Sequence, residues 1–369
     1  MNRYNLGLQF SKCSDPACPQ VVNLQRCAAC KAVVYCSRDH QASDRPRHKS
    51  SCAIVKKQIA AYEAESSTLR ARVCPDQHGQ VLGATANFTV SALSQMFTTI
   101  AGATTQVPRS YLQARSDLVT ALLNIRTGEA VDAALGHAMA MLNADRGDVL
   151  GVRSIVPTLL LRLGRDQEAY DFIKWYATVP HDTYKWGDPA EPFLNLSNED
   201  ATEELDDMTI KNLIVEKLPF LAALVLLKVR LALDLANLTE FVAKRQNTGS
   251  EEDELEAKMQ WVREEAMSGI LHNRQDLISR CGSSQGDALQ ESNKAQIKKL
   301  IAATSVRNKH YWPALHNPTQ YSHGSPTVYA RGSREEVILA FRETWYGWSE
   351  TPQALDFIKA LTSPDVGSR

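Results

Sequence analysis

Cysteine is scarce over most of this chain of 369 residues. Two of its eight cysteines, Cys74 and Cys281, lie beyond residue 52, which excludes a disulfide scaffold spread along the chain. The first twelve residues contain no apolar stretch of the length that a secretory signal needs. We therefore expect an intracellular protein, in the nucleus or the cytoplasm, whose thiols are reduced and available for a metal. The other six cysteines crowd into about forty residues and indicate a local site: Cys13, Cys18, Cys27, Cys30, Cys36 and Cys52.

Long apolar runs and nucleotide-binding motifs are also missing. The most apolar segment contains ten residues without a charge, Leu218–Leu227, whereas a membrane-spanning helix needs about 20 apolar residues. We therefore expect no membrane partner. Without a Walker loop or a G-x-G-x-x-G motif, the chain lacks the usual cradle for the phosphates of a nucleotide.

One short motif has the letters of a catalytic site. Residues Gly282–Gly286 match G-x-S-x-G, the pattern of a nucleophile elbow. That elbow needs a strand before it, and the preceding residues NRQDLISR predict a helix instead. We expect no catalytic residue in this chain, which favours a protein that is not an enzyme.

Strand patterns are few, and most of the chain predicts helices, so the expected fold class is mainly α. Pro219 predicts a kink or a break in the most apolar helix. Two amphipathic segments that meet at Gly164 predict a helical hairpin like those of tetratricopeptide repeats, although no 34-residue repeat is found. Aromatic residues among helix breakers predict ordered loops over 179–198 and 310–333. The predicted helices cover residues 108–126, 129–145, 148–163, 166–178, 210–244, 286–306 and 333–349.

The cysteine-rich segment leads into a helical pattern and then into a break. Ile54, Ile59, Tyr62 and Leu69 recur with helical spacing and predict an exit helix. The segment 74–89, CPDQHGQVLGATANFT, has the proline, glycines and short polar residues of a linker. We therefore predict a metal-binding domain at 1–57, an exit helix and linker at 58–90, and a helical domain at 91–369.

Charge is divided unevenly along the chain. The formal net charge is −1, but residues 1–60 carry ten Lys or Arg against three Asp, which makes this part +7 and the remainder −8. We call residues 1–60 the head. Its positive charge can favour contact of this part of the chain with an acidic partner.

Two histidines complete a set of eight metal ligands in the head. The spacing is Cys13-x4-Cys18-x8-Cys27-x2-Cys30-x5-Cys36-x3-His40-x7-His48-x3-Cys52. Structural zinc takes four ligands, so eight ligands account for two structural Zn²⁺ ions and leave no open position for water. About forty residues bury too little surface to fold alone, so metal binding supplies the folding free energy. The ligands form four close pairs, and their spacing alone does not decide whether the pairs combine in sequence or interleave.

The second half of the head, VVYCSRDHQASDRPRHKSSC, resembles the MYND-type zinc finger. That family has a Tyr-Cys-Ser run, then Cys-Gln, an acidic residue, Trp-Pro and His-Lys before the last Cys. The match extends from Cys13 to Cys52, and the family interleaves its two sites in a cross-brace. The resemblance thus implies one zinc ion held by Cys13, Cys18, Cys36 and His40, and a second held by Cys27, Cys30, His48 and Cys52.

Two residues depart from the family's pattern. His40 stands where the family most often has Cys, a change that tetrahedral zinc accepts. Arg45 stands where the family has Trp, directly before Pro46. In the family, the residues at the positions of Ser37, Gln41 and Arg45 help to form a shallow groove for proline-containing peptides. The resemblance implies that these three residues contact a short peptide, and the arginine favours an acidic or phosphorylated one.

A looser resemblance covers most of the remaining chain. Segments such as YKWGDPAEPFLNL and FRETWYGWSETPQALDFI resemble the helical region of fungal proteins that begin with a MYND finger. This second resemblance implies no activity.

These features favour a zinc-binding adaptor that binds other proteins through short peptide motifs. One alternative is a SET-type lysine methyltransferase, which carries a MYND finger inside its catalytic domain, but only twelve residues precede Cys13 and no Asn-His-Ser run is found. Transcription-associated nucleic-acid binding is another, since the head is basic, yet MYND-like fingers lack the helix that C2H2 fingers place in the major groove. A RING-type ubiquitin ligase would need a Cys-x-His-x2-Cys spacing, which is absent.

Overall fold

The structure is a computed structural model whose described residues fall into two compact units. The first unit comprises residues 11–73, 107–156, 182–188 and 190–192. The second comprises residues 8, 157–181, 193–245, 250–321, 324 and 326–363.

The first unit consists of a small sheet and three long helices. Its two strands pair in antiparallel register, with Gln25 opposite Tyr35 and Arg26 opposite Val34. The elements are β1 (Gln25–Arg26), β2 (Val34–Tyr35), α1 (Arg38–Val73), α3 (Arg109–Leu123), α4 (Gly128–Ala144) and the 3-10 helix η1 (Val152–Ser154).

Helix α1 begins inside the cysteine-rich segment rather than after it. The Ser37 hydroxyl accepts a hydrogen bond of 3.2 Å from the backbone N–H of His40 and so caps the first turn. The helix then continues to Val73 and passes through residues 57 and 58, where we predicted a domain boundary. The predicted exit helix is therefore the second part of a longer helix. The predicted linker at 74–89 and the boundary at 90 lie outside the described residues.

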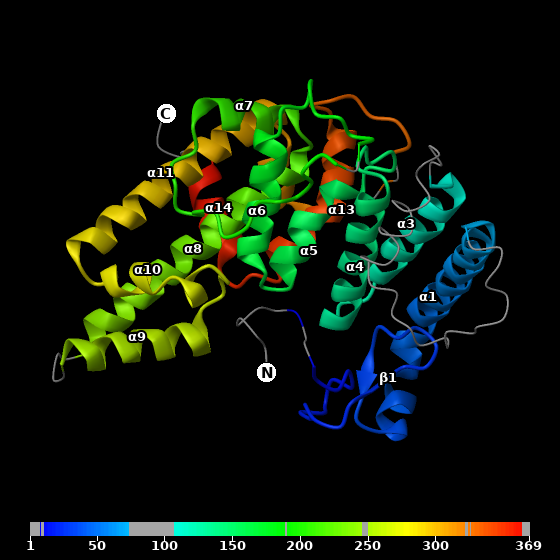
Figure 1. Cartoon of the computed structure of the whole chain (residues 1–369). Helices are drawn as coiled ribbons and strands as arrows, with labels where there is room; N and C mark the ends of the chain where they lie inside the picture. Colours follow the sequence, from blue (N-terminus) through cyan, green and yellow to red (C-terminus); the bar gives the residue numbers. More distant parts are fainter. Residues whose placement is uncertain are drawn as a thin grey trace. The chain divides into compact units, whose positions relative to one another are not determined.

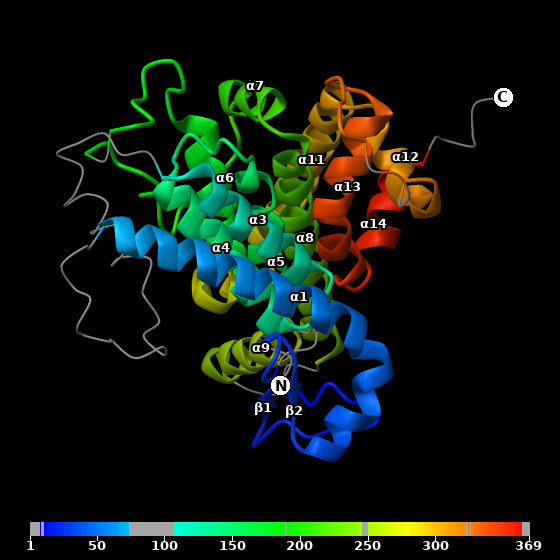
Figure 2. The same cartoon turned by 90° about the vertical axis from the view of Figure 1, so that its right-hand side faces the viewer.

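Helices α1, α3 and α4 pack side by side around Tyr62 (Figure 1 and Figure 2). The buried guanidinium of Arg115 lies 5.0 Å from the ring centroid of Tyr62 and 5.3 Å from that of Tyr111, and it donates a hydrogen bond of 3.1 Å to the Tyr62 hydroxyl. His137 of α4 meets Tyr62 edge-on, with centroids 5.1 Å apart. Burial and the charge of Arg115 lower the pKa of His137 to about 4, so this histidine is neutral at pH 7.

The second unit is built from helices, as the sequence predicts. They are α5 (Val156–Arg162, which begins one residue before this unit), α6 (Asp166–Thr178), α7 (Asp207–Val215), α8 (Leu218–Lys244), α9 (Glu251–Glu265), α10 (Gln275–Arg280), α11 (Ser284–Arg307), α12 (Tyr311–His316), α13 (Arg334–Ser349) and α14 (Ala354–Thr362). Short 3-10 helices lie at Leu271–Asn273 (η2) and Pro318–Gln320 (η3).

Helix α8 is the centre of the second unit. Every residue from Leu218 to Leu235 is buried, and α6, α7, α9, α11, α13 and α14 all contact it, with α11 alongside (Figure 1). Pro219 lies in the first turn of α8, so the predicted break precedes the helix, at a position where a missing backbone N–H costs nothing. Within the described part of the chain, no helix combines the length and apolar composition needed to cross a membrane.

Fully buried charges connect α8 to its neighbours. Arg230 donates to the Leu161 carbonyl (2.7 Å) and to the Met267 carbonyl (2.5 Å). The Asp234 carboxylate accepts hydrogen bonds from the backbone N–H groups of Met267 and Ser268. These bonds fix the segment after α9 to α8, because buried backbone groups left unpaired would be costly.

The predicted helix at 148–163 was wrong in its first half. Gly151 adopts a left-handed φ of 74°, and the Asp148 carboxylate accepts from the N–H groups of Val152 and Arg153. These bonds favour a turn and the 3-10 helix η1, and α5 begins only at Val156. The resemblance to a tetratricopeptide hairpin at Gly164 remains a prediction.

The predicted loop at 310–333 was wrong in part, and α14 was not predicted. Residues Tyr311–His316 form α12, in which Tyr311 and Trp312 are buried. The Trp312 indole donates to the Ile301 carbonyl (3.1 Å), and the Trp348 indole donates to the Tyr311 hydroxyl (3.2 Å). Short helices of this kind owe their stability to tertiary packing, which local periodicity does not reveal.

The buried pair of Arg162 and Glu350 provides a stability test. Two hydrogen bonds of 2.8 and 3.0 Å join the side chains, which are 2% and 3% exposed. A Glu350→Ala substitution would leave the Arg162 charge buried without its carboxylate and should lower the free energy of unfolding by about 3–5 kcal/mol. Urea denaturation followed by circular dichroism measures this loss.

The control is Glu168→Ala, which removes the partner of Arg165 in an ion pair whose side chains are 40% and 54% exposed. Such surface pairs contribute about 0–1 kcal/mol. If Glu350→Ala and Glu168→Ala lowered the free energy of unfolding equally, the buried pair of Arg162 and Glu350 would not have the stabilising role given to it.

Candidate metal centre

In each of the first two ligand pairs, a tight turn brings the two cysteines of the pair together. Cys27 and Cys30 lie in the loop between β1 and β2, where the Lys31 N–H donates to the Cys27 carbonyl (2.9 Å) and Lys31 has a left-handed φ of 58°. The Cys27 N–H in turn donates to the Val33 carbonyl (2.8 Å). In the first pair, the Cys18 N–H donates to the Asp15 carbonyl (3.0 Å), which turns Cys18 back toward Cys13.

Helix α1 supplies ligands to both sites. Cys36 lies just before the helix, and His40 lies in its first turn. His48 and Cys52 follow on the same helix four residues apart, a spacing that puts both side chains on one face. One rigid helix therefore spans both metal sites.

The first tetrad consists of Cys13, Cys18, Cys36 and His40, whose ligand atoms all lie within 4.8 Å of one another. The sulfurs of Cys18 and Cys36 are 3.7 Å apart. The Nδ1 atom of His40 lies 3.1 Å from the Cys36 sulfur and 3.6 Å from the Cys13 sulfur. Cys13 and Cys18 are buried, whereas Cys36 and His40 are partly exposed.

The second tetrad consists of Cys27, Cys30, His48 and Cys52, and its ligand atoms also lie within 4.8 Å of one another. The sulfurs of Cys27 and Cys52 are 3.8 Å apart, and the Nε2 atom of His48 lies 3.4 Å from the Cys30 sulfur. The structure thus groups the pair Cys13/Cys18 with Cys36/His40, and the pair Cys27/Cys30 with His48/Cys52. This is the interleaved grouping that the resemblance implies.

These distances fit tetrahedral zinc. With Zn–S bonds of about 2.3 Å and Zn–N bonds of about 2.0 Å, tetrahedral ligands lie about 3.8 Å apart for two sulfurs and about 3.5 Å apart for sulfur and nitrogen. The sulfur pairs at 3.7 and 3.8 Å match this geometry and are much too far apart for a disulfide. Two structural zinc ions therefore fit, each with three sulfurs and one imidazole nitrogen and with no coordination position left for water.

The thiol pKa values indicate why the second tetrad needs a cation. Burial opposes ionisation of Cys27, but the backbone of Cys30 and the ring of His48 hydrogen-bond to its sulfur and lower its pKa to about 6. Burial and the neighbouring thiolates of Cys27 and Cys52 raise the pKa of Cys30 to about 12. Crowded thiolates repel one another, so a divalent ion is needed for all of them to ionise.

A hydrogen-bond chain centred on the buried Asp44 carboxylate supports the ligand turns. The Tyr35 hydroxyl donates to the Asp44 carboxylate (2.6 Å), and Arg47 donates to the same carboxylate (2.7 Å) and to the Ser14 carbonyl (2.7 Å). This chain joins β2, α1 and the turn that carries Cys13. The spacing of the ligands alone indicates no role for Tyr35, Asp44 or Arg47. Tyr35 and Asp44 do occupy the tyrosine and acidic positions of the MYND pattern, and this match could have indicated that they support the metal sites.

Thr127 connects the finger to helix α4. Its hydroxyl donates to the Ala32 carbonyl at 2.5 Å and accepts from the Ala130 N–H at 3.3 Å. The same side chain therefore satisfies a carbonyl in the loop between β1 and β2 and caps α4. Sequence reasoning missed this residue, since Ala32 and Thr127 are 95 positions apart.

The three residues predicted to contact a peptide lie at the start of α1. Ser37, Gln41 and Arg45 are spaced four residues apart, which places them on one face over two turns. The Ser37 hydroxyl is engaged in capping the helix. Gln41 is partly exposed and Arg45 is exposed.

The G-x-S-x-G motif lacks the context of a nucleophile elbow. Helix α10 precedes it, and Ser284 begins helix α11, so no strand leads into the motif. The hydroxyl of Ser283 accepts from the Gly286 N–H (3.4 Å) as the cap of α11.

Metal analysis tests the eight-ligand assignment. Purified protein should contain two zinc ions per chain by elemental analysis. Cys30→Ala should lower this number to about one, because the second ion loses one of its four ligands. The matched control is Cys281→Ala, which removes a buried thiol outside both tetrads and should leave two ions bound. One zinc ion in the unmodified protein would refute the assignment.

Replacing Thr127 tests the link between the finger and α4. Thr127→Val keeps the shape of the side chain but removes the bond to the Ala32 carbonyl and the cap of α4. Hydrogen exchange at Ala130 should become faster, and urea denaturation should show a loss of about 1–3 kcal/mol. The exposed Thr120, whose hydroxyl donates only to the carbonyl one turn back, is the control. A loss for Thr127→Val no larger than for Thr120→Val would refute the link.

Comparison with known protein families agrees with this geometry. Residues 11–52 match the family described as the MYND finger, a range that includes all eight ligands. No curated protein and no solved structure matches the chain. Residues 11–52 therefore form a MYND zinc finger with two interleaved sites that fit structural zinc.

Proposed function

We propose that this chain is a protein-interaction adaptor whose MYND finger binds a short acidic peptide at the start of helix α1. MYND fingers in general mediate interactions between proteins. The observation that carries the proposal is the pair of complete tetrads, because zinc ions with four protein ligands build a rigid surface and not a reaction site. We propose on the same ground that the chain is not an enzyme.

The face formed by Ser37, Gln41 and Arg45 favours an anionic ligand. Backbone N–H groups at the start of a helix carry partial positive charge, and Arg45 adds a full charge two turns along. Among the described residues Arg45 makes no ion pair with a carboxylate, although its charge acts on the Cys52 thiol, where it opposes the rise in pKa that burial causes. The nearby Asp44 carboxylate is buried and already paired with Tyr35 and Arg47, so it does not neutralise Arg45.

The roles within this face differ. Ser37 caps α1 and so fixes the backbone of the face, while Gln41 and Arg45 present side chains to a ligand. An arginine donates paired hydrogen bonds to a carboxylate or phosphate, whereas the tryptophan of the family would stack on proline. We therefore expect a peptide with acidic or phosphorylated residues, with proline contributing less.

Peptide binding to the zinc-loaded chain of 369 residues tests this proposal. Fluorescence anisotropy would compare a proline-containing acidic peptide with the same peptide in which the acidic residues are replaced by their amides. The acidic peptide should bind more tightly, and Arg45→Ala should weaken it by about 3- to 10-fold, since an exposed charge-assisted contact contributes about 1 kcal/mol.

The matched control is Lys56→Ala, which removes an exposed positive charge elsewhere on α1 and should change binding by less than about 2-fold. Arg45→Trp should shift the preference toward the amide peptide. Binding that ignores both the acidic residues and Arg45 would overturn the proposal.

A further inference from the structure

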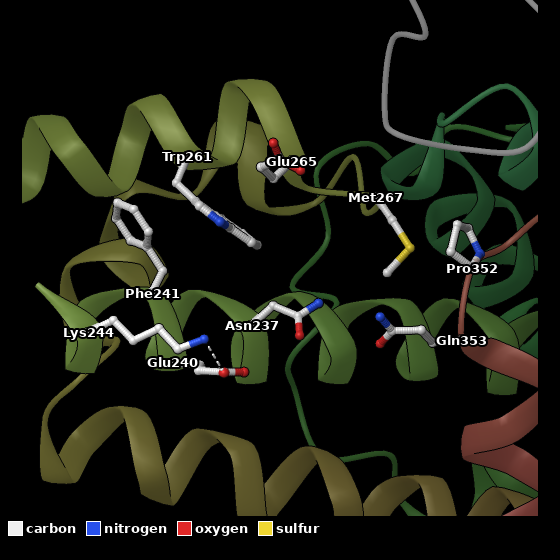
Figure 3. A pocket seen from close by; sticks show the side chains of 9 residues that line it. All are labelled: Asn237, Glu240, Phe241, Lys244, Trp261, Glu265, Met267, Pro352 and Gln353. Atoms are coloured by element: carbon white, nitrogen blue, oxygen red, sulfur yellow. Dashed lines mark ion pairs between the residues drawn. The ribbon is translucent and has the colours of Figure 1, made fainter.

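The second unit contains a cavity of about 400 Å³ with an aromatic wall (Figure 3). Phe241 of α8 and Trp261 of α9 line it, with ring centroids 6.3 Å apart and ring planes inclined by 34°. Met267 and Pro352 add apolar surface. Figure 3 shows the indole pointing from α9 toward α8, above Asn237. A cavity of this size matches small-ligand sites, which occupy about 300–1,000 Å³.

Both carboxylates and basic side chains lie at the rim of this cavity. Glu240 and Glu265 line it against one lysine, Lys244. Helix α9, which forms one wall, has seven carboxylates and two cations, a formal charge of −5. Of the charged residues of α9, Glu265 alone lines the cavity, so the carboxylates that a cationic ligand can reach there are Glu240 and Glu265.

The aromatic wall already holds one arginine of the chain itself. The guanidinium carbon of Arg245 lies 5.6 Å from the ring centroid of Phe241. Cations are attracted to aromatic faces within about 6 Å, most strongly to that of tryptophan. The neighbouring indole of Trp261 is therefore suited to a second guanidinium, supplied by a ligand.

The ion pair between Glu240 and Lys244 can be replaced by a pair with a ligand. It pairs with Lys244 at 2.6 Å, but the two side chains are 62% and 74% exposed. An ion pair so exposed has little stability and readily gives way to a competing cation. A guanidinium on Trp261 could replace Lys244 as the partner of Glu240, and its planar fork would bond both carboxylate oxygens.

The surrounding backbone is held in place before any ligand binds. Met267 is buried and is fixed by Asp234 and Arg230 through its N–H and carbonyl. Gln353 has a left-handed φ of 62°, unusual for a residue other than glycine, and Figure 3 shows its amide facing the cavity. Strained residues of this kind are concentrated at ligand sites.

We propose that this cavity binds an arginine side chain of a basic peptide segment in a partner protein. The guanidinium lies over Trp261 and pairs with Glu240, while the amides of Asn237 and Gln353 contact the peptide backbone. This site lies on the second unit and has the opposite charge preference to the finger, so each proposal can fail without the other.

A matched pair of peptides tests the site. The probe is a fluorescein-labelled Gly-Ser-Gly-Arg-Gly-Ser-Gly peptide, and its control carries citrulline, a neutral isostere of arginine. The zinc-loaded chain of 369 residues should bind the arginine peptide saturably and the citrulline peptide about tenfold more weakly. Trp261→Leu, which keeps an apolar side chain but removes the aromatic face, should weaken binding about fivefold, and so should Glu240→Gln.

Two further variants separate binding from folding. Glu252→Gln removes an exposed carboxylate of α9 that does not line the cavity and should change binding by less than about twofold. Gln353→Gly removes the amide but relieves the left-handed backbone, so binding should fall while the thermal midpoint stays equal or rises.

Three outcomes would overturn the proposal. The first is equal binding of the arginine and citrulline peptides, and the second is full binding by folded Trp261→Leu and Gln353→Gly proteins. The third is a concentration-dependent dimer, abolished by Trp261→Leu, which would identify the basic head of a second copy as the occupant.

Discussion

Tetrahedral coordination by three sulfurs and one imidazole, made twice, is the interaction on which the first unit depends. Residues 11–52 have too few apolar side chains to enclose a core of their own, and zinc binding takes the place of that core. Because the tetrads interleave, each ion joins two turns that are separated by a ligand pair of the other site. Neither site can be complete unless most of the finger is folded.

This coordination also organises the helices of the first unit. Helix α1 carries ligands of both tetrads and continues to Tyr62, where it packs against Arg115 of α3 and His137 of α4. The Thr127 hydroxyl adds a direct bond between the start of α4 and the loop that holds Cys27 and Cys30. The finger therefore belongs to the same compact unit as α1, α3 and α4, and a peptide bound at the start of α1 would contact an element shared by the whole unit.

Sequence reasoning succeeded where chemistry is local. Eight ligands with short spacings predict two zinc ions, since the coordination number is set by the metal. The interleaving came from family resemblance, because pair spacing is equally compatible with sequential sites. The start of α1 was missed because zinc ligands, and not an apolar stripe, occupy the face of its first turns. Contacts between residues far apart in the sequence, such as Arg162 with Glu350 and Thr127 with Ala32, cannot be predicted from local sequence patterns. The cavity beside Trp261 was missed for the same reason.

The coordination spheres can be measured directly by zinc K-edge X-ray absorption on the purified chain of 369 residues. Both tetrads contain three cysteines and one histidine, so the average zinc should have three sulfurs at about 2.3 Å and one nitrogen at about 2.0 Å. An average of two sulfurs and two nitrogens, or a bound oxygen from water, would contradict the two closed, interleaved sites from which the rest of the account follows.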